Sequence, residues 1–291
     1  MDGIIVINKE KGCTSHDVVH NVKKLFGVKV GHTGTLDPNA TGVLPILIGK
    51  GTELSQFLIN HDKKYVATIQ LGKRTDTADV EGEIVEEKDV KEELLTAENI
   101  NNVFKGLIGP QKQVPPMYSA IKVNGKKLYE YARQGKSVEI PEREIEIYDM
   151  QLLNVDTLNK LITYEIYCSK GTYVRTVCEK ISEELDTVGY MKDLKRTMVG
   201  KFQIKDAISI NELKENFDKE DFLKEKVINI EDFFRECPSV ILDAKQLKLF
   251  LNGVMIGSNF EREIYRVYDE NNTFIGIATN ANGCLKRKII I

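Results

Sequence analysis

The chain has 291 residues, and its 41 Lys and Arg against 44 Asp and Glu give a formal net charge of −3. Hydrophobic residues make up 42% and charged residues 29%, which excludes a disordered chain. The length fits one large domain, or a large domain with a small one. The slightly acidic total argues against a tail-driven nucleic-acid binder, although it leaves room for a local basic face.

The charge is unevenly placed along the chain. Residues 81–110 carry 8 acidic and 3 basic side chains, and residues 206–236 carry 10 and 5, so the rest of the chain is net positive. Such acidic blocks are usually solvated faces, and they can also mark surfaces turned away from an anionic partner.

The five cysteines are an odd number without a Cys-x-x-Cys pair, which predicts reduced thiols in a cytoplasmic protein. Together with the four histidines they show no zinc-ligand spacing, so no metal is expected. No targeting or membrane segment is expected either. The apolar run at 4–7 is too short for a signal sequence, and the longest apolar stretch, 42–49, is too short to cross a bilayer.

The first hundred residues alternate strand and helix signals. A β-branched run predicts a strand over 3–8, and the segment from Thr14 to Asp17 can cap a helix over 17–26 that Gly27 closes. The next predicted elements are a glycine-punctuated loop at 30–42, strands at 43–48, 64–71 and 81–86, the last of which could pair with the one before it, and a capped helix at 96–109.

Residues 110–143 are predicted to form a long connection, broken by prolines and rich in lysine and tyrosine. Long loops inside compact domains are usually functional or disordered. Regular elements then return, and the chain ends in a β-rich region. They are strands at 144–153 and 162–169, helices at 173–185 and 244–251, and strands at 265–269, 273–280 and 286–291, with a hairpin turn at 271–272. The mix of helices and antiparallel-type hairpins predicts an α+β fold.

Common nucleotide-binding and hydrolase motifs are missing. The segment 42–51 superficially resembles a phosphate-binding loop, but Lys50 is followed by glycine rather than by the Ser or Thr that such a loop requires. No GxGxxG follows the first strand, and there is no GxSxG. Triphosphatase, dinucleotide-binding and serine-hydrolase functions therefore lose their usual support.

Asp37 is the first candidate for chemistry, although Asp-Pro-Asn is also a common turn and an isolated Asp there is more often a turn residue. The glycines around it would let a ligand approach the backbone. His32 offers a flat ring on the same loop. Arg175, at the start of a predicted helix, could pair with the carboxylate and keep it ionised.

Tyr65 is the second candidate. Its ordinary interpretation is a core or cross-strand aromatic residue in the 64–71 strand. The alternative is a stacking platform for a nucleobase, with Lys63 and Lys64 nearby for phosphates.

Several ordered blocks of the sequence carry a family resemblance. They are residues 31–45, 64–65, 71–72, 74–82, 114–125, 168–175 and 194–197, followed by Gly200 and Phe202. In this order, across about residues 3–202, they closely resemble the bacterial tRNA pseudouridine synthase B (TruB) family.

The resemblance implies a pseudouridine-synthase fold, α+β, with a central mixed, largely antiparallel sheet flanked by helices. It implies a catalytic domain over 1–236, whose 110–143 loop clamps the tRNA T arm through phosphate contacts, and a small PUA-like RNA-binding domain over 237–291. The implied reaction isomerises the T-loop uridine 55 of tRNA to pseudouridine, without metal or organic cofactor. The expected partner is tRNA, with no guide RNA and no membrane, and the protein is expected to be a cytoplasmic monomer.

The resemblance also implies residue roles. Asp37 matches the essential aspartate, Arg175 the arginine that pairs with it, and Tyr65 the tyrosine stacked on the target base. The other implied contacts are to the RNA: His32 fills the space left by the flipped base, Leu194 and Tyr173 line the base pocket, and Lys64, Lys122 and Arg196 bind RNA.

Two positions depart from the family pattern. Lys195 stands where many members carry arginine, and Glu53 where relatives often carry lysine, so both bear on RNA affinity. Two other functions stay open: a guide-RNA-dependent synthase with the same fold, and a tRNA-folding chaperone that binds without catalysis.

Overall fold

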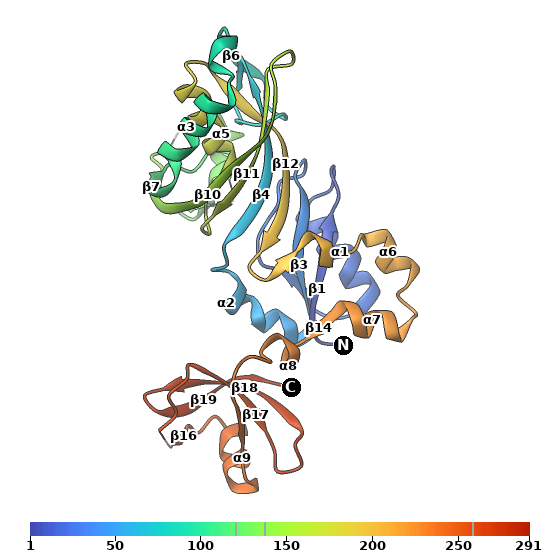
Figure 1. Ribbon diagram of the computed structural model, residues 1–291. Helices are drawn as coiled ribbons and strands as arrows, with labels where there is room; N and C mark the ends of the chain where they lie inside the picture. The colour runs from blue at the N-terminus through green and yellow to red at the C-terminus, as the bar shows by residue number, and fades with distance from the viewer. Residues whose placement is uncertain (120, 137, 258) are drawn as a thin grey trace.

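A computed structural model describes residues 1–291 except Ala120, Ser137 and Ser258. Its larger part is built on a mixed ten-stranded sheet and its C-terminal part on a five-stranded sheet, and helices flank both (Figure 1). The strands of the large sheet are β1 (Gly3–Lys9), β2 (Val30–His32), β3 (Thr41–Ile48), β4 (Lys63–Leu71), β7 (Gly109–Gln113), β10 (Arg143–Asp156), β11 (Leu161–Cys168), β12 (Gly189–Val199), β13 (Phe202–Gln203) and β14 (Val227–Asn229). This architecture confirms the predicted α+β fold.

The strand order in the large sheet is β14-β1-β3-β12-β4-β11-β10-β7, with β2 on β3 and β13 on β12. In the described part of the chain its one parallel pair is β3–β12. The helices are α1 (Ser15–Phe26), α2 (Ser55–Leu58), α3 (Ala97–Leu107), α4 (Leu128–Ala132), α5 (Val174–Glu184), α6 (Ile210–Glu215), α7 (Glu220–Lys226), α8 (Ile230–Phe233) and α9 (Ala244–Leu251). None of the described helices is long and apolar enough to cross a membrane.

Helix α1 shows how local sequence sets an element. Thr14 and Asp17 form a capping box, in which each side chain accepts a hydrogen bond from the backbone N–H of the other. Gly27 ends the helix with a φ of 67°, and its N–H donates to the carbonyl of Lys23. The helix begins two residues before the predicted 17–26 and ends where predicted.

The two faces of strand β4 differ in burial. Its odd-numbered residues from Tyr65 to Leu71 are buried in a core shared with α3 and α5. Its even-numbered residues from Lys64 to Gln70 are only half-buried. Because successive side chains in a strand point to opposite faces, Tyr65 and Lys64 cannot serve the same side of the sheet.

Strand β12 carries two β-bulges, at Lys192 and Thr197, which have no partner on β4. Each bulge adds one residue to the strand and shifts the alternation of its side chains. Leu194 and Arg196 are thereby buried on the face of Tyr65, which is the direct cross-strand partner of Arg196.

Two segments differ from the sequence expectation. Residues 81–86 were expected as a possible partner for the 64–71 strand. Instead β6 (Ile84–Glu87) pairs with β5 (Lys73–Thr75), since both edges of β4 are taken by β11 and β12. The connection over 110–143 is partly regular: it begins within β7 at the sheet edge and holds α4 and the small ladder of β8 (Lys122–Val123) and β9 (Lys126–Lys127). Positions 120 and 137 of this connection lie outside the described residues.

The C-terminal sheet packs against the end of the larger part. Ile277 belongs to the same core cluster as Phe234, and the Tyr268 hydroxyl donates to the Glu231 carboxylate at 2.6 Å. The predicted hairpin joins β17 and β18, with Asn272 in the left-handed region at a φ of 61°. The strands of this sheet are β15 (Ser239–Ile241), β16 (Ile256–Gly257), β17 (Ile264–Tyr268), β18 (Phe274–Ala281) and β19 (Cys284–Ile290).

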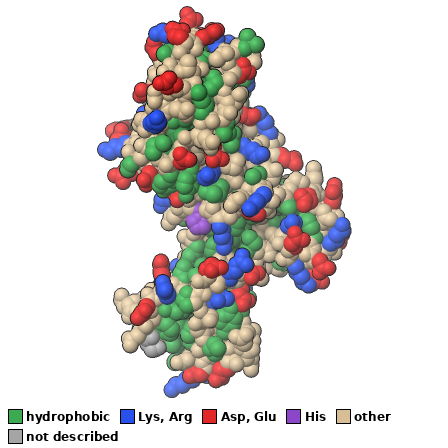
Figure 2. Space-filling model, in the orientation of Figure 1, with side chains coloured by type: hydrophobic (Ala, Val, Ile, Leu, Met, Phe, Trp, Pro, Cys, Tyr) green, Lys and Arg blue, Asp and Glu red, His purple; other side chains and the backbone are tan. Residues whose placement is uncertain are grey.

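The two acidic blocks of the sequence lie far apart in the fold. Residues 81–110 form β6, α3 and their connections, and residues 206–236 form α6, α7, β14 and α8 (Figure 1). Figure 2 shows acidic side chains mixed with basic ones over both regions. Neither block contributes to the pocket described next.

Candidate active site

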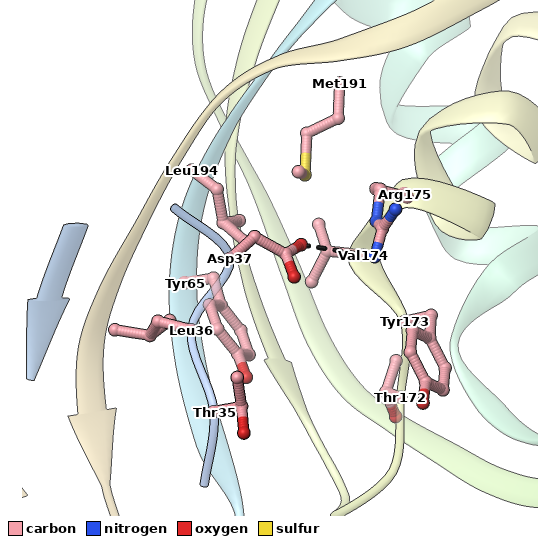
Figure 3. Close-up of a pocket in the computed structure, with 10 residues that line it drawn as sticks. All are labelled: Thr35, Leu36, Asp37, Tyr65, Thr172, Tyr173, Val174, Arg175, Met191 and Leu194. Carbon is pink, nitrogen blue, oxygen red and sulfur yellow. Dashed lines mark ion pairs between the residues drawn. The ribbon is translucent and has the colours of Figure 1, made fainter. Parts of the chain in front are cut away.

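A pocket lies where the loop between β2 and β3 meets β4, β12 and the start of α5 (Figure 3). Its volume is about 110 Å³. Pockets for drug-sized ligands measure roughly 300–1,000 Å³, so this one has room for a single small group. The lining residues are Thr35, Leu36, Asp37, Tyr65, Thr172, Tyr173, Val174, Arg175, Met191 and Leu194.

The loop that carries Asp37 is fixed on both sides of it. The Ser15 hydroxyl donates to the Leu36 carbonyl at 3.1 Å and accepts from the Leu36 N–H at 2.9 Å. The ammonium of Lys9, which is fully buried, donates to the Pro38 carbonyl at 3.0 Å. These buried bonds hold the Asp37 backbone in place, so its carboxylate has a defined direction into the pocket.

Arg175 is the centre of the polar network. Its Nη2 lies 3.3 Å from Asp37 Oδ2, the contact drawn in Figure 3, and also donates to the Tyr118 carbonyl at 2.9 Å. Its Nη1 donates to the Thr77 carbonyl at 3.2 Å and pairs with Asp79 Oδ2 at 3.1 Å. The pairing of Asp37 with Arg175 that the sequence suggested is present.

Asp79 was not singled out from the sequence as a site residue. Its side chain is 11% exposed, against 39% for Asp37, and it reaches the other side of the same guanidinium. Asp79 Oδ1 also accepts from the Thr77 hydroxyl at 2.7 Å and the Glu81 N–H at 3.0 Å. The available signal was its place in the matched block 74–82, where nothing in the spacing distinguishes it from Asp76.

The environment of Asp37 changes its acidity in an unexpected direction. Removal of the carboxylate from water raises its pKa, Arg175 opposes the rise, and the charge of Asp79 adds to it. The net shift is upward. The sequence analysis expected Arg175 to favour the ionised form of Asp37, and Arg175 does lower the pKa, but the effect of burial on the pKa is larger.

Tyr65 and Leu194 form the apolar side of the pocket. Both side chains are 8% exposed and stand on adjacent strands, with the Tyr65 ring beneath Asp37 in Figure 3. Burial raises the pKa of Tyr65 to about 12, and the neighbouring Arg196 guanidinium opposes this rise. A planar ligand entering here would have an aromatic face, an aliphatic side chain and a carboxylate within reach.

Arg196 does not lie at the surface as an RNA-binding residue would. Its side chain is 1% exposed, and it donates to the Val43 carbonyl at 2.8 Å and the Gly34 carbonyl at 3.0 Å. The prediction of a direct RNA contact is wrong for this structure, because the bulge at Lys192 sets the phase that turns Arg196 inward.

His32 and Tyr173 flank the pocket differently. The His32 ring accepts from the Gly34 N–H at 3.3 Å and is half-buried beside the loop, and it is not among the lining residues. Burial lowers its pKa. Tyr173 does line the pocket. The buried Gln113 side-chain amide holds the Tyr173 backbone by two hydrogen bonds: it accepts from the Tyr173 N–H at 2.8 Å and donates to the Tyr173 carbonyl at 3.1 Å.

Lys64 and Lys122 are not brought to the pocket. Lys64 lies on the opposite face of β4, where it pairs with Glu165 at 3.3 Å and stands 5.5 Å from the centre of the Tyr167 ring. Lys122 is exposed on the β8–β9 ladder. The strict alternation of β4 predicts the position of Lys64 once Tyr65 is placed in the pocket.

Comparison with known proteins assigns the family. The chain matches the model for the TruB family pseudouridylate synthase N-terminal domain over residues 22–174. Two C-terminal models follow, for the tRNA pseudouridylate synthase B C-terminal domain over 175–235 and for pseudouridine synthase II TruB over 238–288.

Relatives and solved structures agree with these models. The chain is 42% identical to tRNA pseudouridine synthase B of Bacillus cytotoxicus over 284 residues, which is 95% of this chain and 92% of the relative. It is 42% identical to the Caldanaerobacter subterraneus subsp. tengcongensis enzyme of the same name over 280 residues, 95% and 94% of the two chains. A crystal structure of a Cbf5-Nop10-Gar1 complex shares the fold, with a TM-score of 0.69 at 22% identity over 99% of this chain and 83% of that one. The chain belongs to the TruB family of tRNA pseudouridine synthases.

Proposed function

We propose that this enzyme converts uridine 55 in the T loop of tRNA to pseudouridine, with Asp37 as its essential carboxylate. The observation that carries the proposal is the Asp37–Arg175 pair at 3.3 Å, facing Tyr65 and Leu194 across a pocket of about 110 Å³. The full-length relatives named tRNA pseudouridine synthase B support the same substrate.

The chemistry breaks the N1–C1′ bond, turns the base, and joins C5 to C1′. The proton lost from C5 is matched by one gained at N1, so the reaction is an isomerisation and needs no redox partner. Asp37 would attack C1′ or the base, or remove a sugar proton, and each route requires the ionised carboxylate. Tyr65 would stack on the flipped base, whose extrusion costs a few kcal/mol.

The RNA-binding parts of the proposal lie outside the pocket. We assign residues 1–236 to a catalytic domain and 237–291 to a small PUA-like RNA-binding domain, in which Lys286 and Lys288 are exposed for phosphates. The 110–143 segment would hold the T arm through Lys122 and its neighbours. The enzyme would act as a cytoplasmic monomer on tRNA alone.

Tritium release from 5-tritiated uridine tests this function directly. An unmodified tRNA transcript, with no guide RNA added, should lose tritium with the wild-type protein and none with Asp37→Asn, which should still bind the transcript. Release that appears only when a guide RNA and partner proteins are added would favour the guide-dependent alternative. Binding and refolding of tRNA without release would favour the chaperone.

A further inference from the structure

Arg196 is a buried cation that pairs with no carboxylate among the residues the structure describes. The residue is 1% exposed, its side chain donates hydrogen bonds to two backbone carbonyls, and its direct cross-strand neighbour is Tyr65. Arg175, only slightly more exposed, pairs with two carboxylates. Burying an unpaired charge is costly, and proteins retain such costs mainly at functional sites.

The position of Arg196 joins three elements of the pocket. It stands on β12 directly opposite Tyr65 on β4, reaches Val43 at the start of β3, and reaches Gly34 in the loop that leads to Asp37. The β-bulge at Thr197 lies directly next to Arg196 in the strand. Bulges beside active sites commonly redirect a side chain.

The charges around Tyr65 give Arg196 a specific role. Two groups near Tyr65 can carry a negative charge: Asp37 in the loop and Cys168 on β11. A negative charge on either of them would disfavour a phenolate at Tyr65. Arg196 is the group that favours one. Loss of the C5 proton is a required step of the reaction, and a phenolate beneath the base would be placed to accept it.

We propose that Arg196 is a positioning residue that acts through Tyr65, by orienting the hydroxyl and serving as the counter-ion of its phenolate when it takes the C5 proton. The inference rests on the proposed function. In this step the C5–H bond breaks, its electron pair restores the C5–C6 double bond of the uracil ring, and the proton moves to the Tyr65 oxygen. Tyr65 gives its own proton to water earlier in the cycle and is neutral again once it holds the C5 proton, while N1 takes a proton from water, so the proton count closes.

The test compares Arg196→Gln with Arg196→Lys, Tyr65→Phe and the double variant. Single-turnover tritium release at saturating enzyme should fall about 30-fold or more for Arg196→Gln, in the range for loss of acid–base catalysis, while the Kd for tRNA stays within about threefold. With 5-deuterated uridine the isotope effect should be larger than in wild type, since C5 proton removal becomes limiting. Arg196→Lys, which keeps the charge, should recover part of the rate.

The double variant separates positioning from general structural damage. If Arg196 acts through Tyr65, Arg196→Gln should cost nothing further in a Tyr65→Phe background. The matched control is Arg266→Gln. This change removes an arginine that also donates to a backbone carbonyl, at 3.0 Å, and that donates to the Tyr268 hydroxyl at 3.1 Å, but lies far from the pocket. It should keep the wild-type rate and isotope effect.

Other results would overturn the inference. They are an unchanged isotope effect in Arg196→Gln, a loss of tRNA binding that parallels the loss of rate, or fully multiplicative defects in the double variant. Should Arg196→Gln fail to fold, the isotope effect and double-variant comparison are made with Arg196→Lys, whose ammonium lacks the planar fork. A wild-type protein that releases no tritium would instead refute the proposed function.

Discussion

Asp37 and Asp79 share one guanidinium, with Arg175 at 3.3 Å from the first carboxylate and 3.1 Å from the second. Asp79 is the more buried of the two, and it is fixed by Thr77 and the Glu81 N–H. The side of the guanidinium away from the pocket is therefore anchored, and the side toward the pocket is left to orient Asp37.

Asp79→Asn should consequently damage catalysis more than binding. An amide keeps the contacts to Thr77 and Glu81 but removes the charge that holds Arg175 in place. The single-turnover rate should fall about 10- to 100-fold, as for a misplaced catalytic group, with the Kd for tRNA nearly unchanged. Asp186→Asn, at an exposed carboxylate that pairs with Lys88, is the control and should keep the wild-type rate. Equal rates for the two variants would contradict the anchoring role.

The raised pKa of Asp37 predicts how stability depends on pH. Its folded pKa lies above its unfolded value, so the folded state binds more protons and loses stability as pH rises through this window. Asp37→Asn should therefore raise Tm at pH 7, and the gain should vanish at a pH below the ordinary aspartate pKa. Thermal unfolding followed by circular dichroism measures this.

Asp186 supplies a control of opposite sign. Hydrogen bonds from Lys88 and Lys91 lower its pKa to about 2. Its contribution to stability is present at neutral pH and is lost as pH falls toward 2, so Asp186→Asn should lower Tm at pH 7. A lower Tm at pH 7 for Asp37→Asn as well would show that the Arg175 attraction outweighs the burial of Asp37.

The clamp proposal predicts a salt dependence. Lys122, Lys126 and Lys127 lie together on the β8–β9 ladder, and each phosphate contact contributes about 0.7–0.9 to the slope of log K against log salt. Replacing all three by Gln should flatten this slope by about 2 and leave the rate at saturating enzyme unchanged. Filter binding between low and moderate salt measures the slope. A wild-type curve that is already flat would exclude the clamp.

The sequence was sufficient to predict three side chains that line the pocket. Asp37, Tyr65 and Arg175 lie in matched blocks, and the structure places all three on one cavity. The sequence could not predict that Arg196 is buried, because nothing in the sequence of the strand indicates the β-bulges at Lys192 and Thr197. Bulges depend on the partner strand, and therefore on tertiary structure.

Pairing partners were also beyond the sequence. The 81–86 strand was recognised, but its partner is β5, since the edges of β4 are occupied by strands from much later in the chain. Asp79 was missed for a related reason. Its role depends on the guanidinium of Arg175, which is 96 residues away in the chain. Only the folded structure brings the two side chains to 3.1 Å from each other.

Gly42 gives the last prediction, because it lies at the parallel pair that joins the two halves of the large sheet. A Cβ at this position would lie 2.1 Å from the Arg196 carbonyl oxygen, and its φ is +105°. Gly42→Ala should force β3 away from β12, lowering the free energy of unfolding by about 2 kcal/mol or more and displacing both Arg196 and the Asp37 loop. Gly106→Ala is the control: it lies in α3 with open space around it, and should be neutral or stabilising by about 0.5–1 kcal/mol. Denaturant unfolding measures both changes, and an unaltered midpoint for Gly42→Ala would mean that the β3–β12 contact is not the rigid joint on which the pocket depends.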